Sequence, residues 1–278
     1  MARRKSMAPS TPPTPNPALR VLSLGAGVQS STIAMMIASK ELPSVDCAIF
    51  ADTGWEPRAV YDWLGWVEAH VPFPVYRVRK DDVDLRTAAL NRPNKRHGFA
   101  VPFFHGDAGR SPYRECTVEW KINPIIQKCR ELLGIPKGRR VPPNVWVQMV
   151  VGISWDEAQR ATNGPIRFIL NDYPLIERRW TRQRCLEWFI GKGYPLPPRS
   201  SCLGCPFHSD DEWRRIRDTN PDEFAQTVED DRVLTERWGH RMHKRGPLAS
   251  VDLTKDDRQL GIPGIPGMIN ECLGMCGT

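Results

Sequence analysis

Two of the eight cysteines form a close pair, Cys202-Leu-Gly-Cys205, in a segment rich in proline and serine. Two thiolates at this spacing can bind one metal ion or one iron–sulfur cluster, or form a redox disulfide. The chain offers Cys116, His208, Cys272 and Cys276 as further ligands. We expect Cys116, Cys202 and Cys205 to act together, with a fourth place for Cys272, Cys276 or a substrate sulfur. A [4Fe–4S] cluster is the favoured occupant, zinc the second choice, and unmetallated thiols the third.

A glycine-containing loop separates an apolar run from an apolar segment of helical spacing. Backbone amides at such a strand-to-helix turn favour an anion, and glycines let the ligand approach closely. The loop has no lysine, as a kinase-type P-loop needs, and it lacks the third glycine of the dinucleotide fingerprint. The predicted anion-binding residues are Ser23, Gly25, Ala26, Gly27, Gln29, Ser30 and Ser31. A tight turn that binds no ligand is the alternative.

The elements that must position this loop alternate between strands and helices. Strands are predicted at 20–24, 47–51, 73–79 and 144–154, and helices at 28–40, 57–70, 117–134 and 181–193. This alternation predicts a parallel sheet with right-handed crossovers. Residues 81–113 are polar and predicted to be a long loop with short helices. Cys47 falls in a strand and Cys129 and Cys185 fall in helices, so these three are expected to be buried.

We therefore predict an α/β fold, a Rossmann-like parallel sheet flanked by helices. Its predicted divisions are a disordered tail at 1–18, a nucleotide-binding domain at 19–195, and a cysteine-containing region at 196–278 that completes the site.

The 278 residues carry a formal net charge of +7, and 40% of them are hydrophobic. A packed core is feasible, and the charge suits polyanions such as nucleotides, tRNA or DNA. A basic surface with no specific partner is the alternative. The sequence contains no apolar run long enough to cross a membrane and no apolar signal-peptide core. We expect a cytoplasmic protein whose cysteines are thiols or metal ligands.

The loop resembles the pyrophosphate loop of the adenine nucleotide alpha-hydrolase (PP-loop) superfamily, and most closely that of the phosphoadenosine phosphosulfate (PAPS) reductase family. Four later segments resemble family elements in the family's order: FADTGWEP (50–57), ECTVEWKINPI (115–125), GISWDEAQR (152–160) and YPLIERRWT (173–181). The resemblance implies a HUP-type Rossmann-like fold and a bound ATP or PAPS. It places Asp52 and Thr53 near the nucleoside, with Gly152 in a matched element.

Charged residues lie in or beside these matched elements. Arg114, Lys121 and Arg160 are candidates to contact phosphate or sulfate. Asp156 and Glu157 follow a predicted strand end, where they can bind Mg²⁺ or orient a base. For each of the five, a solvated or ion-paired surface charge is the alternative.

Two departures from the family pattern leave the chemistry open. Gln29 replaces an aspartate, and an amide is a poorer Mg²⁺ ligand than a carboxylate. Glu271-Cys272 resembles the family's C-terminal nucleophile motif, but the following residues differ. One form of the enzyme hypothesis is adenylation followed by sulfur transfer to tRNA, DNA or a small molecule. The other is reduction of PAPS or its relative APS to sulfite by Cys272 with a thioredoxin-like partner. A non-catalytic nucleotide- or nucleic-acid-binding relative is the third hypothesis, and a homodimer is a further candidate assembly.

Overall fold

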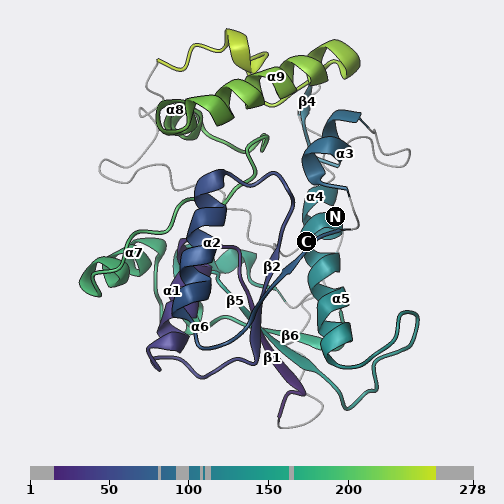
Figure 1. Cartoon of the computed structure of the whole chain (residues 1–278), viewed down its shortest axis with the longest axis vertical. Coiled ribbons are helices and arrows are strands. Elements are labelled where there is room, and N and C mark those ends of the chain that lie inside the picture. The colour runs from purple at the N-terminus through teal and green to yellow at the C-terminus, as the bar shows by residue number, and fades with distance from the viewer. Residues whose placement is uncertain are drawn as a thin grey trace, which may run out of the picture.

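The computed structural model describes residues 16–80, 83–91, 100–106, 109, 114–162 and 166–254. Its centre is a five-stranded sheet in the order β3-β2-β1-β5-β6, in which every pairing is parallel (Figure 1). The strands are β1 (Leu19–Ser23), β2 (Cys47–Ala51), β3 (Val75–Val78), β5 (Val147–Val151) and β6 (Ile169–Asp172). The predicted Rossmann-like fold is confirmed.

Helices pack on both faces of this sheet because successive strand residues point to opposite sides. Leu22 belongs to a core cluster with residues of α1 (Val28–Ala38), α2 (Arg58–His70) and α7 (Arg182–Gly191). Its neighbour Val21 belongs to a second cluster with residues of α5 (Asn123–Leu132). The central strands are therefore largely apolar, and all five residues of β2 are buried.

The strand order reverses between β1 and β5. The chain continues from β1 to β2 and β3 on one side, and from β5 to β6 on the other. Loops that follow neighbouring strands on either side of such a reversal diverge and leave a crevice at the carboxyl ends of the strands. The glycine-containing loop follows β1 and so lies at this point.

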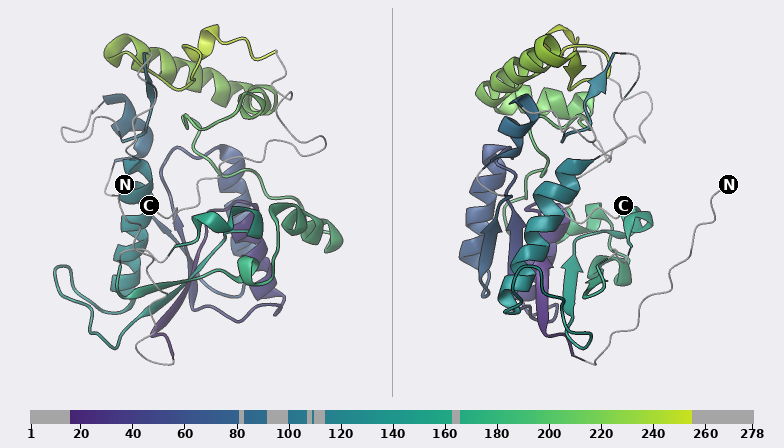
Figure 2. Two further views of the ribbon diagram at one scale, coloured as in Figure 1. Left: turned by 180° about the vertical axis from the view of Figure 1, so that it is seen from behind. Right: turned by 90° about the vertical axis from the view of Figure 1, so that its right-hand side faces the viewer.

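A smaller layer lies above the sheet (Figures 1 and 2). It contains α3 (Leu85–Asn91), α8 (Asp210–Thr219) and α9 (Pro221–Trp238). Strand β4 (Phe104–His105) pairs antiparallel with β7 (His240–Arg241). A third core cluster combines residues of 55–120 with residues of 203–253. Part of the predicted loop at 81–113 thus forms α3 and β4.

The helix predicted at 117–134 has three parts: α4 (Glu115–Thr117), a π-helical turn (Val118–Ile122) and α5. A 3₁₀ helix (Trp155–Arg160) follows β5, α6 (Pro174–Glu177) follows β6, and a 3₁₀ turn (Leu248–Ser250) follows β7. Neither β6 nor α9 was predicted from the sequence. No helix of the described residues is long and apolar enough to span a membrane. The predicted nucleophile and fourth ligand, Cys272, and its alternative Cys276 lie outside the described residues, as does most of the predicted tail at 1–18.

Candidate functional site

The glycine-containing loop turns sharply between β1 and α1. Ala26 adopts a left-handed conformation with φ of 54°, which costs about 1–2 kcal/mol for a residue other than glycine. Gly27 stands before α1 without a side-chain cap, and the first turn of α1 has no acidic residue. The amino end of the 11-residue helix α1 therefore keeps its partial positive charge.

The two loop serines bind within the protein. Ser30 Oγ accepts a hydrogen bond from the Gly25 N–H at 3.1 Å and donates to the Gly27 carbonyl at 3.4 Å. Ser31 Oγ accepts from the Trp63 indole N–H at 2.8 Å. Both serines are fully buried. Their hydroxyl groups shape the loop, so the predicted anion binding would depend on backbone N–H groups.

Gly152, after β5, fits tightly against the start of α1. A Cβ at this position would lie 2.7 Å from Ser30 N and 2.9 Å from Ser30 Cα. Both are backbone atoms, so no rotamer change can relieve the contact. This predicted site residue is thus brought together with the loop, and it leaves no room for a side chain.

Gln29 links the loop to the 3₁₀ helix after β5. Its fully buried amide Nε2 donates to Glu157 Oε2 at 3.1 Å and to Ser154 Oγ at 3.4 Å. Glu157 also accepts from Arg160 Nη1 at 2.5 Å. Asp156 Oδ1 accepts from the Arg182 N–H at the first residue of α7, at 3.1 Å. Glu157 and Arg160 therefore adjoin the loop, while Asp156 contacts the start of a helix.

Asp52 follows β2 and belongs to a separate network. It accepts hydrogen bonds from Tyr61 Oη at 2.7 Å, from the Gly54 N–H at 2.8 Å and from Arg79. Burial favours a raised pKa, but the bonds from Arg79, Tyr61 and Gly54 outweigh it and lower the pKa of Asp52. This carboxylate is ionised at neutral pH, at the edge where a nucleoside is predicted.

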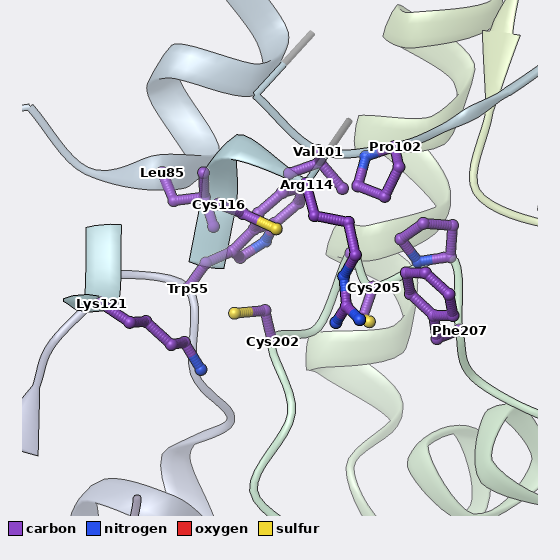
Figure 3. Close-up of a pocket in the computed structure, with 12 residues that line it drawn as sticks. Trp55, Leu85, Val101, Pro102, Arg114, Cys116, Lys121, Cys202, Cys205 and Phe207 are labelled. Carbon is purple, nitrogen blue, oxygen red and sulfur yellow. The ribbon is translucent and has the colours of Figure 1, made fainter. Parts of the chain in front are cut away.

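The cysteines predicted to act together line one pocket. Cys116 comes from α4, and Cys202 and Cys205 come from the Cys-x-x-Cys loop (Figure 3). The basic residues Arg114 and Lys121 line the same pocket. Its apolar walls include Trp55, Leu85, Val101 and Phe207. The structure thus brings the three predicted cysteines to one pocket, and their joint role stays a prediction.

Cys202 is a half-buried thiol beside a buried ion pair. Its Sγ lies 3.4 Å from Thr53 Oγ1 and donates to Glu56 Oε1 at 3.4 Å. Glu56 Oε1 also lies 3.3 Å from Lys121 Nζ. Burial, and then the charge of Glu56, raise the pKa of Cys202 well above its ordinary value, although Lys121 opposes them. The thiol form therefore predominates at neutral pH.

The Cys-x-x-Cys loop is a fixed turn. The Cys205 N–H donates to the Cys202 carbonyl at 3.0 Å, and the Leu203 N–H donates to the Trp55 carbonyl at 2.9 Å. His208 Nε2 lies 2.9 Å from the Cys202 carbonyl, so this nitrogen carries a proton. Burial lowers the pKa of His208 to about 4, which keeps the ring neutral. His208 therefore supports the turn, and its Nε2 is not available as a metal ligand.

The pocket contains the type of ligand that binds an iron–sulfur cluster. In this structure, however, the described cysteine side chains are too far apart to hold one. Three thiols and two cationic side chains share the pocket, and cations offset the charge of thiolates. Within the described ranges, no group of three or more His, Cys, Asp or Glu side chains is close enough to hold a metal ion. A cluster bound here would require the thiols to move toward each other.

Several residues of the site were missed from the sequence. Glu56 and Trp55 lie in the FADTGWEP segment. A carboxylate shortly after the end of a parallel strand is typical of a ligand site, so Glu56 could have been predicted from the sequence. Tyr61 and Arg79 had no such signal, because their bonds to Asp52 depend on how α2 and β3 pack.

The fold and site together define a doubly wound α/β protein with a glycine-containing turn at its strand-order reversal and a thiol-lined pocket at the residues that follow β2. No family model matches the sequence, and no curated protein matches it. A crystal structure of PAPS reductase from Candida auris, in a phosphate complex, matches with a TM-score of 0.43 and 16% identity. The match covers 66% of this chain and 76% of that chain.

Proposed function

We propose that the protein binds an adenine nucleotide at the glycine-containing loop and carries out sulfur chemistry in the adjacent thiol pocket. The observation that carries the proposal is the convergence of Cys116, Cys202 and Cys205 on the residues after β2. Strand β2 pairs with β1, which the loop follows, so both features belong to neighbouring carboxyl ends of one sheet. The carboxyl ends of the strands are where open α/β sheets bind their ligands.

The nucleotide phosphates would lie at the amino end of α1. The uncapped first turn and the close approach of Gly152 favour an anion bound by backbone amides. The nucleoside would extend toward Asp52 and Thr53. Arg160, which pairs with Glu157 beside the loop, would contact phosphate. If Mg²⁺ takes part, Glu157 and Asp156 are its candidate ligands in this chain, since Gln29 offers only an amide.

In the favoured form of the reaction, an acceptor oxygen attacks the α-phosphate of ATP and pyrophosphate leaves. A sulfur nucleophile then forms a bond to the acceptor carbon, and AMP leaves with the oxygen. An iron–sulfur cluster would hold or supply that sulfur, with Cys116, Cys202 and Cys205 as ligands and Cys272 as a candidate fourth. The raised pKa of Cys202 makes its thiol a weak nucleophile without a metal, and a metal bound there would have to displace its proton.

Reduction of PAPS or APS is the second candidate. It is supported by the observation that the described thiols do not form a group close enough to hold a metal ion. With PAPS, the Cys272 thiolate would attack the sulfonate sulfur and adenosine 3′,5′-bisphosphate would leave. A thioredoxin-like dithiol would then attack the resulting thiosulfonate at the cysteine sulfur. Sulfite would leave and the partner's disulfide would close. Lys121 and Arg114 would offset the sulfonate charge in the pocket.

Metal analysis and product analysis separate these forms. Anaerobically purified protein should contain about four irons and four sulfides per chain. Cys202→Ala should lose them, and Cys185→Ala, a buried cysteine of the sheet core, should keep them. AMP and pyrophosphate from ATP support sulfur transfer, whereas sulfite from PAPS supports reduction. Protein that lacks iron, binds no nucleotide and forms neither set of products would overturn the proposal and leave a non-catalytic relative.

A further inference from the structure

We propose that Trp155, together with Arg178 and Arg179, forms a stacking platform for a base of a single-stranded nucleic acid. This inference rests on the proposed function. It adds the class of the acceptor substrate, a single-stranded nucleic acid. It concerns a surface outside both the loop and the thiol pocket.

Trp155 is held in an exposed position at the carboxyl end of β5. Its side chain is 47% exposed, whereas most large apolar side chains of the described residues are buried. The Trp155 N–H donates to the Trp180 carbonyl at 2.7 Å, and the neighbouring Asp156 binds the Arg182 N–H. Two hydrogen bonds thus fix the backbone beneath the ring. A rigid, exposed indole presents a flat apolar face to a ligand at little entropic cost.

Arg179 adjoins this ring, and Arg178 precedes Arg179 in the sequence. The Arg179 guanidinium lies 5.8 Å from the centre of the Trp155 ring. Arg178 Nη2 donates to the Glu41 backbone carbonyl at 2.7 Å. Among the described residues, neither arginine forms an ion pair with a carboxylate. A cation beside an aromatic ring suits a ligand that carries both a phosphate and a base.

Most of the acidic groups near this surface already have partners. Asp156 accepts the bond that starts α7, and Glu187 pairs with Arg184 at 3.3 Å. Glu41 pairs with Lys192 at 2.8 Å. Glu177 is exposed next to Arg178 and is the one nearby carboxylate for which no such bond is found in the described part of the chain. The local balance remains positive, which favours a polyanion.

The platform adjoins the proposed nucleotide site from the β5 side. Trp155 directly follows Ser154, whose Oγ accepts from Gln29 of the glycine-containing loop. The nucleoside is proposed on the opposite, β2 side of that loop, next to Asp52. A base stacked on Trp155 would therefore bring its strand to the edge of the phosphate site without occupying the nucleoside position. This placement suits an acceptor better than it suits the adenine of the nucleotide.

The test is binding of fluorescein-labelled dT12 and U12, followed by fluorescence anisotropy without added nucleotide. Trp155→Ala should raise the Kd about tenfold, as removal of one stacking partner does. Trp238→Ala, which removes an indole that is 37% exposed at the end of α9, should not. The double variant Arg178→Ala/Arg179→Ala should lower the slope of log K against log salt by about 0.7 for each phosphate that these side chains neutralise. Arg232→Ala, on α9 and paired with Glu229, is the matched control.

Several outcomes would overturn the inference. They include an absence of oligonucleotide binding by the wild-type protein, and binding by Trp155→Ala that is as tight as that of the wild type. Equal losses in Trp155→Ala and Trp238→Ala would show a general effect on the fold. Weaker ATP binding by Trp155→Ala with unchanged oligonucleotide binding would assign the ring to the nucleotide itself. Because the assay uses neither nucleotide nor turnover, its result is independent of whether the sulfur chemistry is found.

Discussion

Replacing Gly152 by alanine tests whether the end of β5 and the glycine-containing loop form one rigid unit. The new Cβ would lie 2.7 Å from Ser30 N, 2.9 Å from Ser30 Cα and 3.1 Å from Gln29 C. Ordinary van der Waals contact begins near 3.4 Å, so either the loop or the strand end must move by several tenths of an ångström. The strand cannot move alone, because Val151 is paired with Ser23 of β1.

We expect Gly152→Ala to lower the free energy of unfolding by about 1–3 kcal/mol, the usual cost of overpacking a core. Displacement of the first turn of α1 should also misalign the backbone amides proposed to bind phosphate. ATP binding, measured by isothermal titration calorimetry, should weaken about tenfold or more, since 1.4 kcal/mol corresponds to a factor of ten. Urea denaturation followed by circular dichroism gives the stability.

Gly65→Ala is the matched control. Gly65 lies on the exposed side of α2, and a Cβ there meets no atom within 4 Å. Alanine in a helix interior should raise the stability by about 0.5–1 kcal/mol and leave ATP binding unchanged. If Gly152→Ala proves as stable as Gly65→Ala and binds ATP equally well, the close packing of the strand end against the loop has no role in binding.

Three further predictions concern the thiol pocket and the Cys-x-x-Cys turn beside it. Gly204→Ala would place a Cβ 2.1 Å from the Trp55 ring, so it should displace the Cys-x-x-Cys turn and reduce the iron content of anaerobically purified protein, measured by colorimetric assay. Lys121→Met leaves Glu56 without its cation, so it should lower the free energy of unfolding, measured by urea denaturation, by about 3–5 kcal/mol. The double variant Lys121→Met/Glu56→Gln should recover most of this loss. For His208, the folded pKa of about 4 lies below its ordinary value of 6.5, so the unfolded state binds more protons between these pH values. Its contribution to stability should fall by about 3 kcal/mol as the pH drops from 6.5 to 4, and the pH profile of His208→Gln should lack that fall.

Much of the fold was predictable because the sheet is parallel and buried on both faces. Mostly apolar runs mark β1, β2 and β5, and the helices between them have regular spacing. Strand β6 (Ile169–Asp172) was missed because half of its four residues are polar, and edge strands need less burial. Helix α9 was missed although Pro221 begins it and Gly239, in a left-handed conformation, ends it.

The site was predictable in its residue types and less so in its contacts. The spacing of Cys202 and Cys205 signalled a shared role, and the structure brings Cys116 to the same pocket. No spacing rule could show that Glu56 would accept from Cys202, since the two lie on segments joined only by tertiary packing. The same applies to Gln29, whose side chain reaches Glu157 across the strand-order reversal.

The pairing of β4 with β7 has a consequence for how this chain can be divided. Phe104 and His105 bind to a strand at 240–241, and Arg86 of α3 forms an ion pair with the buried Asp230 of α9 at 2.7 Å. The domain boundary near residue 195 stays a prediction from sequence. A truncation there would remove the partners of α3 and β4 and expose Leu85 and Phe103 to solvent. The cysteine-containing region after residue 195 therefore depends on α3 and β4 for its packing. Moving it into another protein would require moving those elements with it.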